Sequence, residues 1–326
     1  MSTNAIRIHA YGDPSVLRWE SVELPPPGPG EAQIRQRAVG LNFIDIYHRT
    51  GLYAVPGLPS GIGLEGAGVV EAIGPEVSEV VPGDRVAYAG GPIGAYAQAR
   101  NLPAHRLVRL PDAISDQQAA AMMLQGMTAE YLLRRVYRVK AGDTILIHAA
   151  AGGVGLIVCQ WAHHLGATVI GTVGSPEKAD LARAHGCSFP ILYREEDFRQ
   201  RVREITGGAG VPVVYDSVGK DTFEKSLDCL CPRGLMVSFG QSSGKVPPLD
   251  LGTLSAKGSL FVTRPTLMTY SASREDLLGS ASALFDVVTS GAVRIEVNQS
   301  FPLADAPRAH RALEERRTTG STVLTV

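Results

Sequence analysis

The chain has 326 residues, 44% of them hydrophobic, and a formal net charge of −1, which together predict about two globular domains with a sizeable core. This charge balance argues against nucleic acid or an anionic membrane as partner, and no apolar run reaches the roughly 18 residues of a spanning helix. The four cysteines form no C-x-x-C pair and the N-terminal residues have no signal-peptide pattern, so we expect a cytoplasmic protein with reduced thiols.

The first part of the chain, to about Asp112, favours β-structure. A proline-rich segment, P-P-P-G-P-G at 25–30, is incompatible with a helix or a central strand. Short apolar or alternating runs with close turns predict a small barrel-like domain. The expected strands are Ile6–His9, Leu17–Val22, Glu31–Val39 and Gly66–Ile73.

From Ser115 onward the pattern changes to alternating strands and helices. Ser115 can cap a helix, and the strands that follow are almost continuously apolar, which is typical of parallel strands covered on both faces. The C-terminal helices Arg274–Thr289 and Ala304–Arg316 and the strand Thr322–Val326 are expected to return to the first domain. The expected strands of the parallel sheet are Thr144–Ala149, Thr168–Val173, Val211–Asp216, Gly234–Phe239 and Leu260–Thr263. The expected helices are Gly155–Leu165, Glu177–His185, Asp197–Ile205 and Thr222–Leu230.

Residues Thr144–Gly155 carry the most informative motif. A strand-like apolar run leads into A-A-A-G-G-V-G at 149–155, and a helix-like stretch follows. This arrangement opens the βαβ unit that binds dinucleotides, because the turn lets a pyrophosphate approach the N–H groups at the helix N-terminus. Ala150 occupies the first glycine position of G-x-G-x-x-G, so a turn that only packs a helix against a sheet is the alternative.

Other motifs accompany this turn and together indicate a family. They are G-L-N-F-I-D at 40–45, G-L-E-G-A-G at 63–68, P-G-D-R-V at 82–86, V-Y-D-S-V-G at 214–219 and G-L-M-V-S-F-G at 234–240. With Gly142, Asp143 and Gln160 at signature spacing, the chain resembles the zinc-free medium-chain dehydrogenase/reductases of the quinone oxidoreductase (zeta-crystallin-like) family. Within that family it is most similar to the bacterial NADPH:quinone reductases. His163 departs from the basic residue or serine usual near its position.

The resemblance implies an α/β fold with two domains. A GroES-like β-rich catalytic domain is expected over 1–125, completed by 266–326, and a Rossmann domain with a doubly wound parallel sheet over 126–265. The family also implies a cleft between the domains and a homodimer. Relatives pair through edge strands of the Rossmann sheet, here expected at Leu235–Phe239 and Leu260–Thr263.

The catalytic zinc site of related alcohol dehydrogenases is broken in this sequence. Those enzymes use a cysteine, the histidine of G-H-E and a further cysteine or carboxylate, whereas Asn42 and Leu64 stand at the first two positions. Leucine has no electron pair to donate to a metal. The region Ala89–Asn101 has no cysteine to form a structural-zinc lobe, and His48 and His105 are lone histidines. We therefore predict no metal.

The end of the second Rossmann strand favours NADPH over NADH. NAD-specific sites place Asp or Glu there for the ribose 2′-OH, but this strand is followed by Gly174 and Ser175. Ser175 followed by proline is a good helix start, whose N-terminus attracts an anion, and Lys178 adds a positive charge. Tyr193 matches a residue that the family uses against the same phosphate. An ordinary capped helix with a solvated lysine is the alternative.

The remaining cofactor contacts follow from the resemblance. Arg316 matches a position that reaches the cofactor from the returning C-terminal segment, although Glu314–Arg317 also has the composition of a solvated helix end. The other expected positions lie near the nicotinamide, at the glycine turn or after strand ends: Phe43, Ile44, Asp45, Ile46, Tyr47, Thr128, Tyr131, Gly152, Gly153, Val154, Ser217, Phe239, Gly240, Gln241, Ser242, Ser243, Arg264 and Pro265.

Without zinc, a hydride acceptor must already be electron-poor, which favours quinones and conjugated carbonyls. Asn42, Tyr47 and Tyr53 are the candidates for orienting the substrate or contacting an oxyanion, with a packing role as the alternative for Tyr53. No essential acid is assigned, because a reduced quinone can take protons from water. Two-electron and one-electron reduction are both compatible with the sequence.

These observations predict a zinc-independent NADPH:quinone oxidoreductase. One alternative keeps the fold and reduces α,β-unsaturated aldehydes or ketones. A second alternative is a crystallin-like or RNA-binding protein that holds NADPH without turnover, although the near-neutral charge and the lack of a basic-aromatic stripe argue against RNA.

Overall fold

The structure, a computed structural model, describes residues 1–326 and divides them into two compact units. Unit 1 comprises Met1–Met127, Ser271–Thr289 and Ile295–Val326, and unit 2 comprises Thr128–Tyr270 and Ser290–Arg294. Among the helices, none combines the length and the apolar character needed to cross a membrane.

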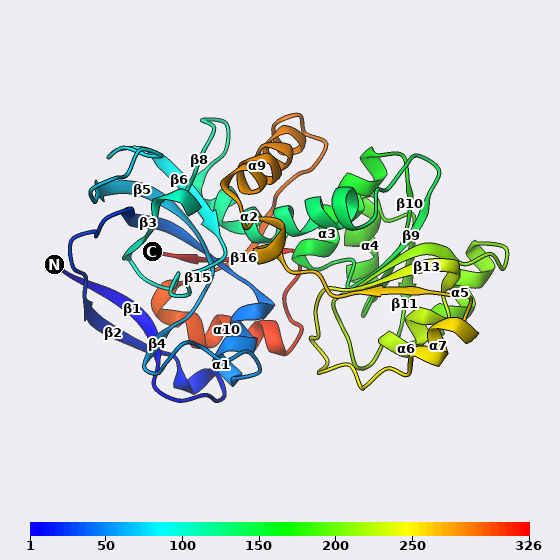
Figure 1. The fold of residues 1–326 in the computed structure, drawn as a ribbon. Helices are drawn as coiled ribbons and strands as arrows, with labels where there is room; N and C mark the ends of the chain where they lie inside the picture. The colour runs from blue at the N-terminus through cyan, green and yellow to red at the C-terminus, as the bar shows by residue number, and fades with distance from the viewer. The chain divides into compact units, whose positions relative to one another are not determined.

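Unit 1 is built around the long strand β3 (Glu31–Leu41). Its first half pairs with β7 (Ala99–Pro103), its length pairs with β5 (Glu65–Ile73), and its end pairs with the C-terminal strand β16 (Ser321–Thr325). The C-terminus therefore completes the sheet of the N-terminal half, as Figure 1 shows for β15 and β16. The other strands of the unit are β6 (Arg85–Ala89), β8 (Val108–Arg109) and β15 (Val297–Pro302) in this sheet, and β1 (Ser2–Ile8), β2 (Arg18–Glu23) and β4 (Ser60–Gly61) in a second sheet.

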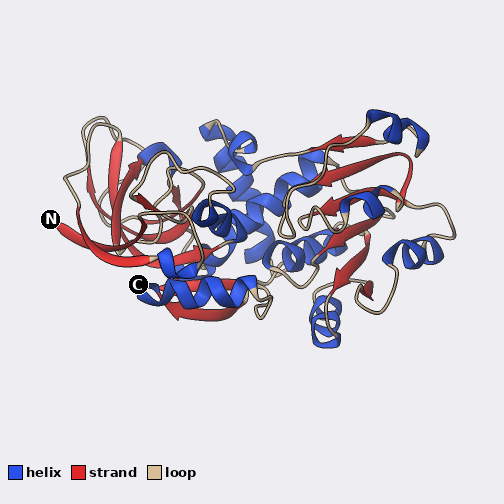
Figure 2. Ribbon diagram, turned by 90° about the horizontal axis from the view of Figure 1, so that it is seen from below, coloured by secondary structure: helices blue, strands red, loops and turns tan.

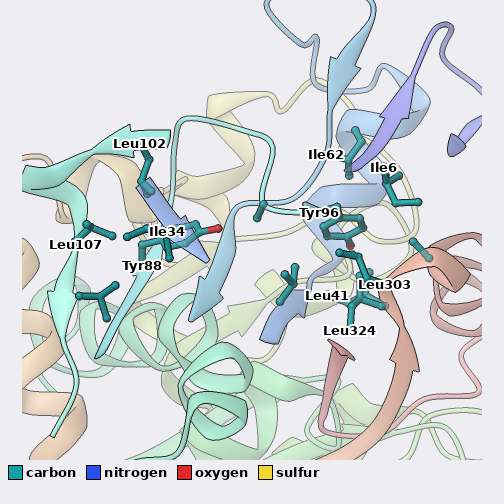
Figure 3. Packing of buried hydrophobic residues seen from close by; sticks show 14 of the residues in the cluster. Ile6, Ile34, Leu41, Ile62, Tyr88, Tyr96, Leu102, Leu107, Leu303 and Leu324 are labelled. Carbon is teal, nitrogen blue, oxygen red and sulfur yellow. The ribbon is translucent and has the colours of Figure 1, made fainter. Parts of the chain in front are cut away.

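The glycines of the G-L-E-G-A-G motif are needed for close packing in this sheet. A Cβ on Gly68 would lie 2.1 Å from the carbonyl oxygen of Arg35 on the neighbouring strand. Gly63 has a φ of +93°, and a Cβ there would lie 2.3 Å from the ring of Tyr96. Because the space is free, Tyr96 enters the core. Figure 3 shows it among the buried residues Ile6, Ile62, Leu303 and Leu324.

Helices of unit 1 include one that the sequence analysis did not predict. Helix α1 (Phe43–Thr50) begins at Asn42, whose backbone N–H donates to Asp45 Oδ2 at 2.9 Å, and ends at Gly51, which has a φ of 79°. The pair Asn42 and Asp45, three residues apart, and the following glycine are the helix start and stop signals that could have revealed it. The other helices are α2 (Asp116–Tyr131), which crosses into unit 2, α9 (Arg274–Thr289) and α10 (Ala306–Glu314).

Unit 2 is a parallel six-stranded sheet in the order β11-β10-β9-β12-β13-β14. Numbered from β9, this is the Rossmann order 3-2-1-4-5-6, which confirms the predicted doubly wound sheet. Figure 1 shows α3 and α4 on one face of this sheet and α6 on the other, and the view from below in Figure 2 shows the sheet covered by helices. The strands are β9 (Thr144–His148), β10 (Thr168–Val173), β11 (Phe189–Leu192), β12 (Val211–Asp216), β13 (Leu230–Ser238) and β14 (Phe261–Thr263). The helices are α3 (Gly153–His164), α4 (Pro176–Ala184), α5 (Phe198–Ile205), α6 (Phe223–Leu227), α7 (Leu251–Ala256) and α8 (Leu267–Tyr270), with a π-helical turn over Leu132–Val136.

Two expectations about β13 are wrong. The helix predicted over Thr222–Leu230 ends at Leu227, and β13 already begins at Leu230, where it pairs with β12 before a register shift. Strand β13 also pairs with β14 on its other side, so the segment Leu235–Phe239 cannot be an edge. The three-residue strand β14 is the edge on that side of the sheet.

Candidate functional site

The glycine turn follows β9 directly. Ala149 adopts a left-handed φ of 56°, and the Gly152 N–H donates to the Ala149 carbonyl at 2.9 Å. Gly152 is the N-cap of α3 and provides no side-chain cap. The first N–H groups of α3 are therefore suited to an anion, as in dinucleotide-binding turns. This geometry fits the predicted pyrophosphate contacts of Gly152, Gly153 and Val154.

The end of β10 brings together the four residues predicted to select the 2′-phosphate. A Cβ on Gly174 would lie 3.0 Å from the hydroxyl of Tyr193, whose backbone N–H donates to Val173 at 3.2 Å. Ser175 is the N-cap of α4, and its Oγ accepts from the Lys178 N–H at 3.4 Å. The N-terminus of α4, with Lys178 in its first turn, and the Tyr193 hydroxyl thus lie at one corner of the sheet.

An acidic residue at the same corner was not anticipated. The exposed carboxyl of Glu177 hydrogen-bonds to the Ser175 side chain, and this bond lowers the pKa of Glu177. Glu177 lies in the first turn of α4, where a carboxylate is favoured by the helix dipole. A bound phosphate would have to displace this carboxylate from the serine hydroxyl.

The loops after β12 and β13 are held against each other. The Ser242 N–H donates to the Ser217 carbonyl at 3.1 Å, and a Cβ on Gly240 would lie 2.6 Å from that same oxygen. Arg264 Nη1 donates to the carbonyl of Gly240 at 2.8 Å, and Ser243 Oγ donates to Val218 at 2.8 Å. The structure thus gathers the predicted segment Phe239–Ser243 with Ser217, Arg264 and Pro265 at the carboxyl ends of the strands, where ligands of open α/β sheets lie.

Beneath these loops lies a buried polar network that the sequence analysis missed. His148, the last residue of β9, bonds to Thr172 Oγ1 at 2.9 Å and to Ser226 Oγ at 2.8 Å. Asp216 Oδ1 accepts the Val218 N–H at 2.7 Å, and its Oδ2 is 3.3 Å from Ser226 Oγ. Burial lowers the pKa of His148. The network ties the ends of β9, β10 and β12 together under the glycine turn.

Asn42 is fixed by a chain of directed hydrogen bonds within unit 1. Ser321 Oγ donates to Gln125 Oε1 at 2.8 Å, Gln125 Nε2 donates to Asn42 Oδ1 at 3.1 Å, and Asn42 Nδ2 donates to Glu65 Oε2 at 2.6 Å. The carboxamide orientation is therefore set, and at most one of its two N–H groups can serve a substrate. Burial raises the pKa of Glu65 to about 8.

Tyr47 on α1 and Tyr53 in the loop after it lie in one aromatic cluster. The Tyr47 ring packs edge-on against Phe43 at 5.5 Å and against Tyr53 at 5.1 Å, between ring centroids. The Tyr53 N–H donates to the Tyr47 carbonyl at 3.0 Å, which folds the loop after α1 back onto the helix. Asp45, Ile46 and Tyr47 are all buried in unit 1, and their predicted contacts with the cofactor stay predictions.

Three further residues predicted to contact the cofactor are Thr128, Tyr131 and Arg316. The Tyr131 ring stacks on Tyr270 at 4.7 Å with an interplanar angle of 14°, and burial raises the pKa of Tyr131, whose hydroxyl bonds to Thr128. Arg316 follows α10 with a left-handed φ of 58°. Its N–H donates to Leu313 at 3.1 Å, which makes it the residue after the helix cap, where glycine is usual.

The residues of unit 1 do not fit a catalytic zinc. The side chain of Asn42 is hydrogen-bonded to Glu65 and Gln125, and the Leu64 side chain is buried and has no atom that could coordinate a metal. No group of three or more His, Cys, Asp or Glu side chains among residues 1–326 is arranged to hold a metal ion. Zinc independence stays a prediction that activity measurements on metal-depleted protein can test.

Comparisons with known proteins agree with this architecture. Residues 28–112 match the family described as alcohol dehydrogenase GroES-like domain, and residues 153–277 match the family described as zinc-binding dehydrogenase. A protein of Pseudomonas aeruginosa named quinone oxidoreductase is 58% identical over 319 residues, covering 98% of both chains. The chain belongs to the quinone oxidoreductase family of medium-chain dehydrogenase/reductases.

Two further members of this family are informative. The crystal structure of Escherichia coli quinone oxidoreductase complexed with NADPH has a TM-score of 0.98 at 50% identity and covers 99% of this chain and 100% of that one. A Burkholderia protein named 2-haloacrylate reductase is 47% identical over 323 residues, covering 97% of both chains. Family membership confirms the resemblance and the GroES-like and Rossmann assignment, while the roles of individual site residues stay predictions.

Proposed function

We propose that the protein is a cytoplasmic NADPH:quinone oxidoreductase that transfers hydride from NADPH to quinones without a metal. The observation that carries the proposal is the corner after β10, where Gly174, Ser175, Lys178 and Tyr193 meet and the strand end has no carboxylate. A 2′-phosphate would find a helix N-terminus, an ammonium group and a hydroxyl there. The Escherichia coli relative that was solved as an NADPH complex supports the same cofactor.

The chain's own residues would bind and orient the cofactor along the carboxyl ends of the strands. The first N–H groups of α3 would receive the pyrophosphate, and Gly152, which has no side chain, would let it approach the backbone. The loops carrying Ser217 and Gly240 are fixed by Arg264, so their backbone groups are preorganised for the nicotinamide half. When bound, NADPH supplies the hydride.

The residues of α1 would act on the acceptor. Asn42, held by Gln125 and Glu65, offers an N–H of fixed direction to a quinone oxygen. Tyr47 offers a hydroxyl from a ring that packs against Phe43 and Tyr53. Preorganised donors of this kind stabilise charge that develops on oxygen during hydride transfer. Water can supply the final proton, so no side chain is required as an acid.

The second candidate function is reduction of conjugated carbonyl compounds. It is favoured by the 47% identity to the protein named 2-haloacrylate reductase, because a haloacrylate is an electron-poor alkene. The same hydride donor and the same oxygen-binding groups would serve both acceptors. The preference for quinones rests on the relatives named quinone oxidoreductase, which are more similar to this chain.

We also propose a homodimer that forms through β14. This strand is an edge of the sheet, and its side chains Phe261 and Val262 are 60% and 37% exposed. An exposed apolar edge strand is an aggregation hazard unless a partner covers it. Pairing with a second copy would continue the sheet across the interface. Sedimentation that finds only monomer at working concentration would overturn this proposal.

The test is an NADPH-oxidation screen with three groups of acceptors under the same conditions. Benzoquinones and naphthoquinones should be reduced with higher kcat/KM than α,β-unsaturated aldehydes and ketones. Higher efficiency with the conjugated carbonyls would favour the second candidate. Tight NADPH binding without turnover on any acceptor would contradict both and favour a binding role.

A further inference from the structure

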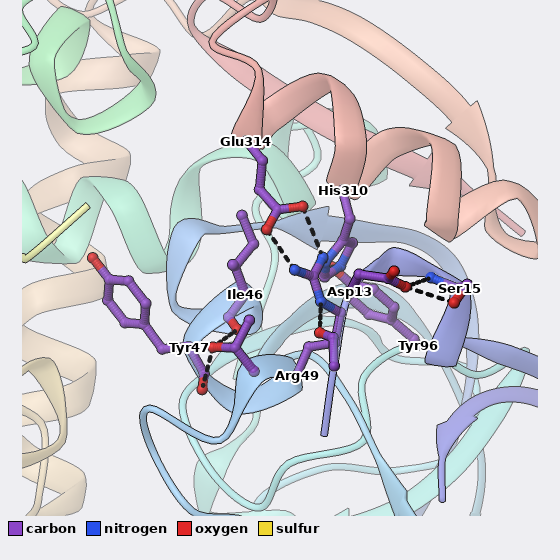
Figure 4. Close-up of polar contacts among 10 residues, drawn as sticks. Asp13, Ser15, Ile46, Tyr47, Arg49, Tyr96, His310 and Glu314 are labelled. Atoms are coloured by element: carbon purple, nitrogen blue, oxygen red, sulfur yellow. Dashed lines mark hydrogen bonds and ion pairs between the residues drawn. The ribbon is translucent and has the colours of Figure 1, made fainter. Parts of the chain in front are cut away.

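Four buried polar side chains form a closed ring behind helix α1. Tyr96 Oη lies 2.9 Å from Asp45 Oδ2 and 3.1 Å from His310 Nε2, and His310 Nδ1 lies 3.2 Å from Arg49 Nη1. Asp45 and Arg49 close the ring through the helix, since they are one turn apart on α1. All four side chains are at most 1% exposed. Figure 4 shows Arg49, His310 and Tyr96 grouped on one side of the helix.

The hydrogen bonds of the ring run in one direction. Arg49 has only donors, so it must donate to His310 Nδ1. The other nitrogen of a neutral imidazole then carries the proton and donates to Tyr96, whose hydroxyl donates to Asp45. Burial lowers the pKa of His310 to about 3, which keeps the imidazole neutral. The donor and acceptor of each hydrogen bond in the ring are thus defined, from Arg49 through His310 and Tyr96 to Asp45.

Glu314 fixes the ring from the end of α10. Its carboxylate accepts from Arg49 Nη1 at 3.1 Å and from Nη2 at 2.5 Å, and its side chain remains 31% exposed. A buried guanidinium needs such a partner, because an unpaired charge in the core is strongly destabilising. The C-terminal helix therefore holds the same face of α1 as the ring does.

Tyr47 lies on the opposite face of α1. Successive residues of an α-helix are about 100° apart, so the mean direction of positions 45 and 49 differs by about 180° from that of position 47. In Figure 4 the Tyr47 side chain points away from Arg49 and His310 accordingly. Any rotation of α1 about its axis would break the ring and would move the Tyr47 hydroxyl by a similar angle.

We infer that the ring of Asp45, Tyr96, His310 and Arg49, with Glu314, positions Tyr47 for hydride transfer to the acceptor. This inference rests on the proposed function, in which the Tyr47 hydroxyl contacts the quinone. Tyr96 is the central positioning residue, since its backbone is anchored to β-structure by bonds to Ile6 at 2.8 Å and Ile62 at 2.9 Å. Its hydroxyl thereby sets the rotation of α1 against the core.

The test compares Tyr96→Phe with Tyr88→Phe. Both tyrosines are fully buried in the same core, and each forms hydrogen bonds through its hydroxyl. The Tyr88 hydroxyl donates to Gln36 Oε1 at 2.5 Å and has no part in the hydrogen-bonded ring behind α1. Each substitution keeps the aromatic ring of the side chain and removes only its hydroxyl, so both variants should fold with similar small losses of stability. Tyr96→Phe should lower kcat for naphthoquinone reduction by about tenfold or more with an unchanged NADPH Kd, because small misplacements of reacting groups are costly. Tyr88→Phe should leave kcat within about twofold.

A double-mutant cycle shows whether Tyr96 acts through Tyr47. In a Tyr47→Phe background, Tyr96→Phe should change kcat by less than about twofold, since coupled residues are non-additive. The inference would be overturned if Tyr96→Phe and Tyr88→Phe lowered kcat equally, or if Tyr96→Phe had its full effect on kcat in the Tyr47→Phe background. It would also be overturned if Tyr47→Phe alone left kcat unchanged. In each case quinone reduction itself would stand.

A readout independent of turnover separates this inference from the proposed function. In protein labelled with 3-fluorotyrosine, the Tyr47 signal in the ¹⁹F NMR spectrum, assigned by its loss in Tyr47→Phe, should shift in Tyr96→Phe and stay in place in Tyr88→Phe. An unshifted Tyr47 signal in Tyr96→Phe would overturn the inference. Failure of the unmodified protein to reduce any quinone would instead overturn the proposed function.

Discussion

Gly152 and Gly155 both belong to the glycine turn, but the structure has room for a side chain only at Gly152. A Cβ on Gly152 would have the Ala149 carbonyl oxygen as its nearest atom, at 3.3 Å, and the backbone there has φ −83° and ψ 174°, which alanine adopts readily. A Cβ on Gly155 would lie 2.3 Å from the same oxygen. Gly155→Ala therefore forces α3 away from β9, and overpacking of this kind costs about 1–3 kcal/mol.

Gly152→Ala should change stability little and cofactor binding strongly. The free energy of unfolding should stay within about 1 kcal/mol of the parent and can rise, because alanine restricts the unfolded chain. The added methyl group would stand where we propose that the pyrophosphate approaches the backbone, so the NADPH Kd should rise about tenfold or more. Gly155→Ala should instead lower the free energy of unfolding of the ligand-free protein.

The two effects are measured by urea unfolding without cofactor and by titration of NADPH fluorescence. Gly57→Ala is the control, because a Cβ at Gly57 would meet no atom within 4 Å, and it should change neither quantity. The reasoning would be refuted if Gly152→Ala destabilised the ligand-free protein as much as Gly155→Ala does. It would also be refuted if Gly152→Ala bound NADPH as tightly as the parent.

Three more predictions follow from single positions. Lys178→Ala should raise the NADPH Kd about tenfold in fluorescence titrations and leave the NADH Kd unchanged, since only the 2′-phosphate loses an ion pair; equal effects on both cofactors would argue against the assignment. Arg316→Gly should raise the free energy of unfolding by about 1 kcal/mol, because it relieves a left-handed φ of 58°, and it should also weaken NADPH binding. Arg233→Gly relieves a similar φ of 63°, so it should raise the free energy of unfolding and leave NADPH binding unchanged. Burial raises the pKa of Asp45 to about 7, so the folded state holds this proton more tightly than the unfolded state, and unfolding free energy should fall as pH rises from about 4 to about 7. Because burial also raises the pKa of Glu65 to about 8, Asp45→Asn should reduce that decline in urea melts at several pH values without abolishing it, and an unchanged slope would contradict the role of Asp45.

The Rossmann half of the fold was predictable because its strands are nearly continuous apolar runs separated by capped helices. The buried strands β9 and β12 and the caps of α3 and α4 carry this information locally. Strand β13 was misjudged at its start because Leu227 and Leu230 have helical spacing, while the register shift that begins the strand depends on its partner β12. Which strand forms the edge also depends on pairing, which no local pattern specifies.

The meeting of Gly174, Ser175 and Lys178 after β10 was predictable from the sequence, whereas the contact of Glu177 with Ser175 and the ring behind α1 were not. Gly174, Ser175 and Lys178 are close in sequence, so a strand end and a helix start suffice to bring them together. Arg49 and Glu314 are 265 residues apart and meet only because the C-terminal segment returns to unit 1. In the sequence, Glu314 has the pattern of a solvated helix end, and nothing near it indicates that it compensates a buried arginine.

The most direct test of the account is the ratio of kcat/KM for NADPH and NADH with 1,4-naphthoquinone, measured on protein dialysed against a metal chelator. We predict full activity after dialysis and a kcat/KM for NADPH at least about tenfold higher than for NADH, because contacts of the 2′-phosphate with Lys178 and the N-terminus of α4 would contribute roughly 1.4 kcal/mol or more. Equal efficiency with NADH, or activity that is lost on dialysis and restored by zinc, would contradict it.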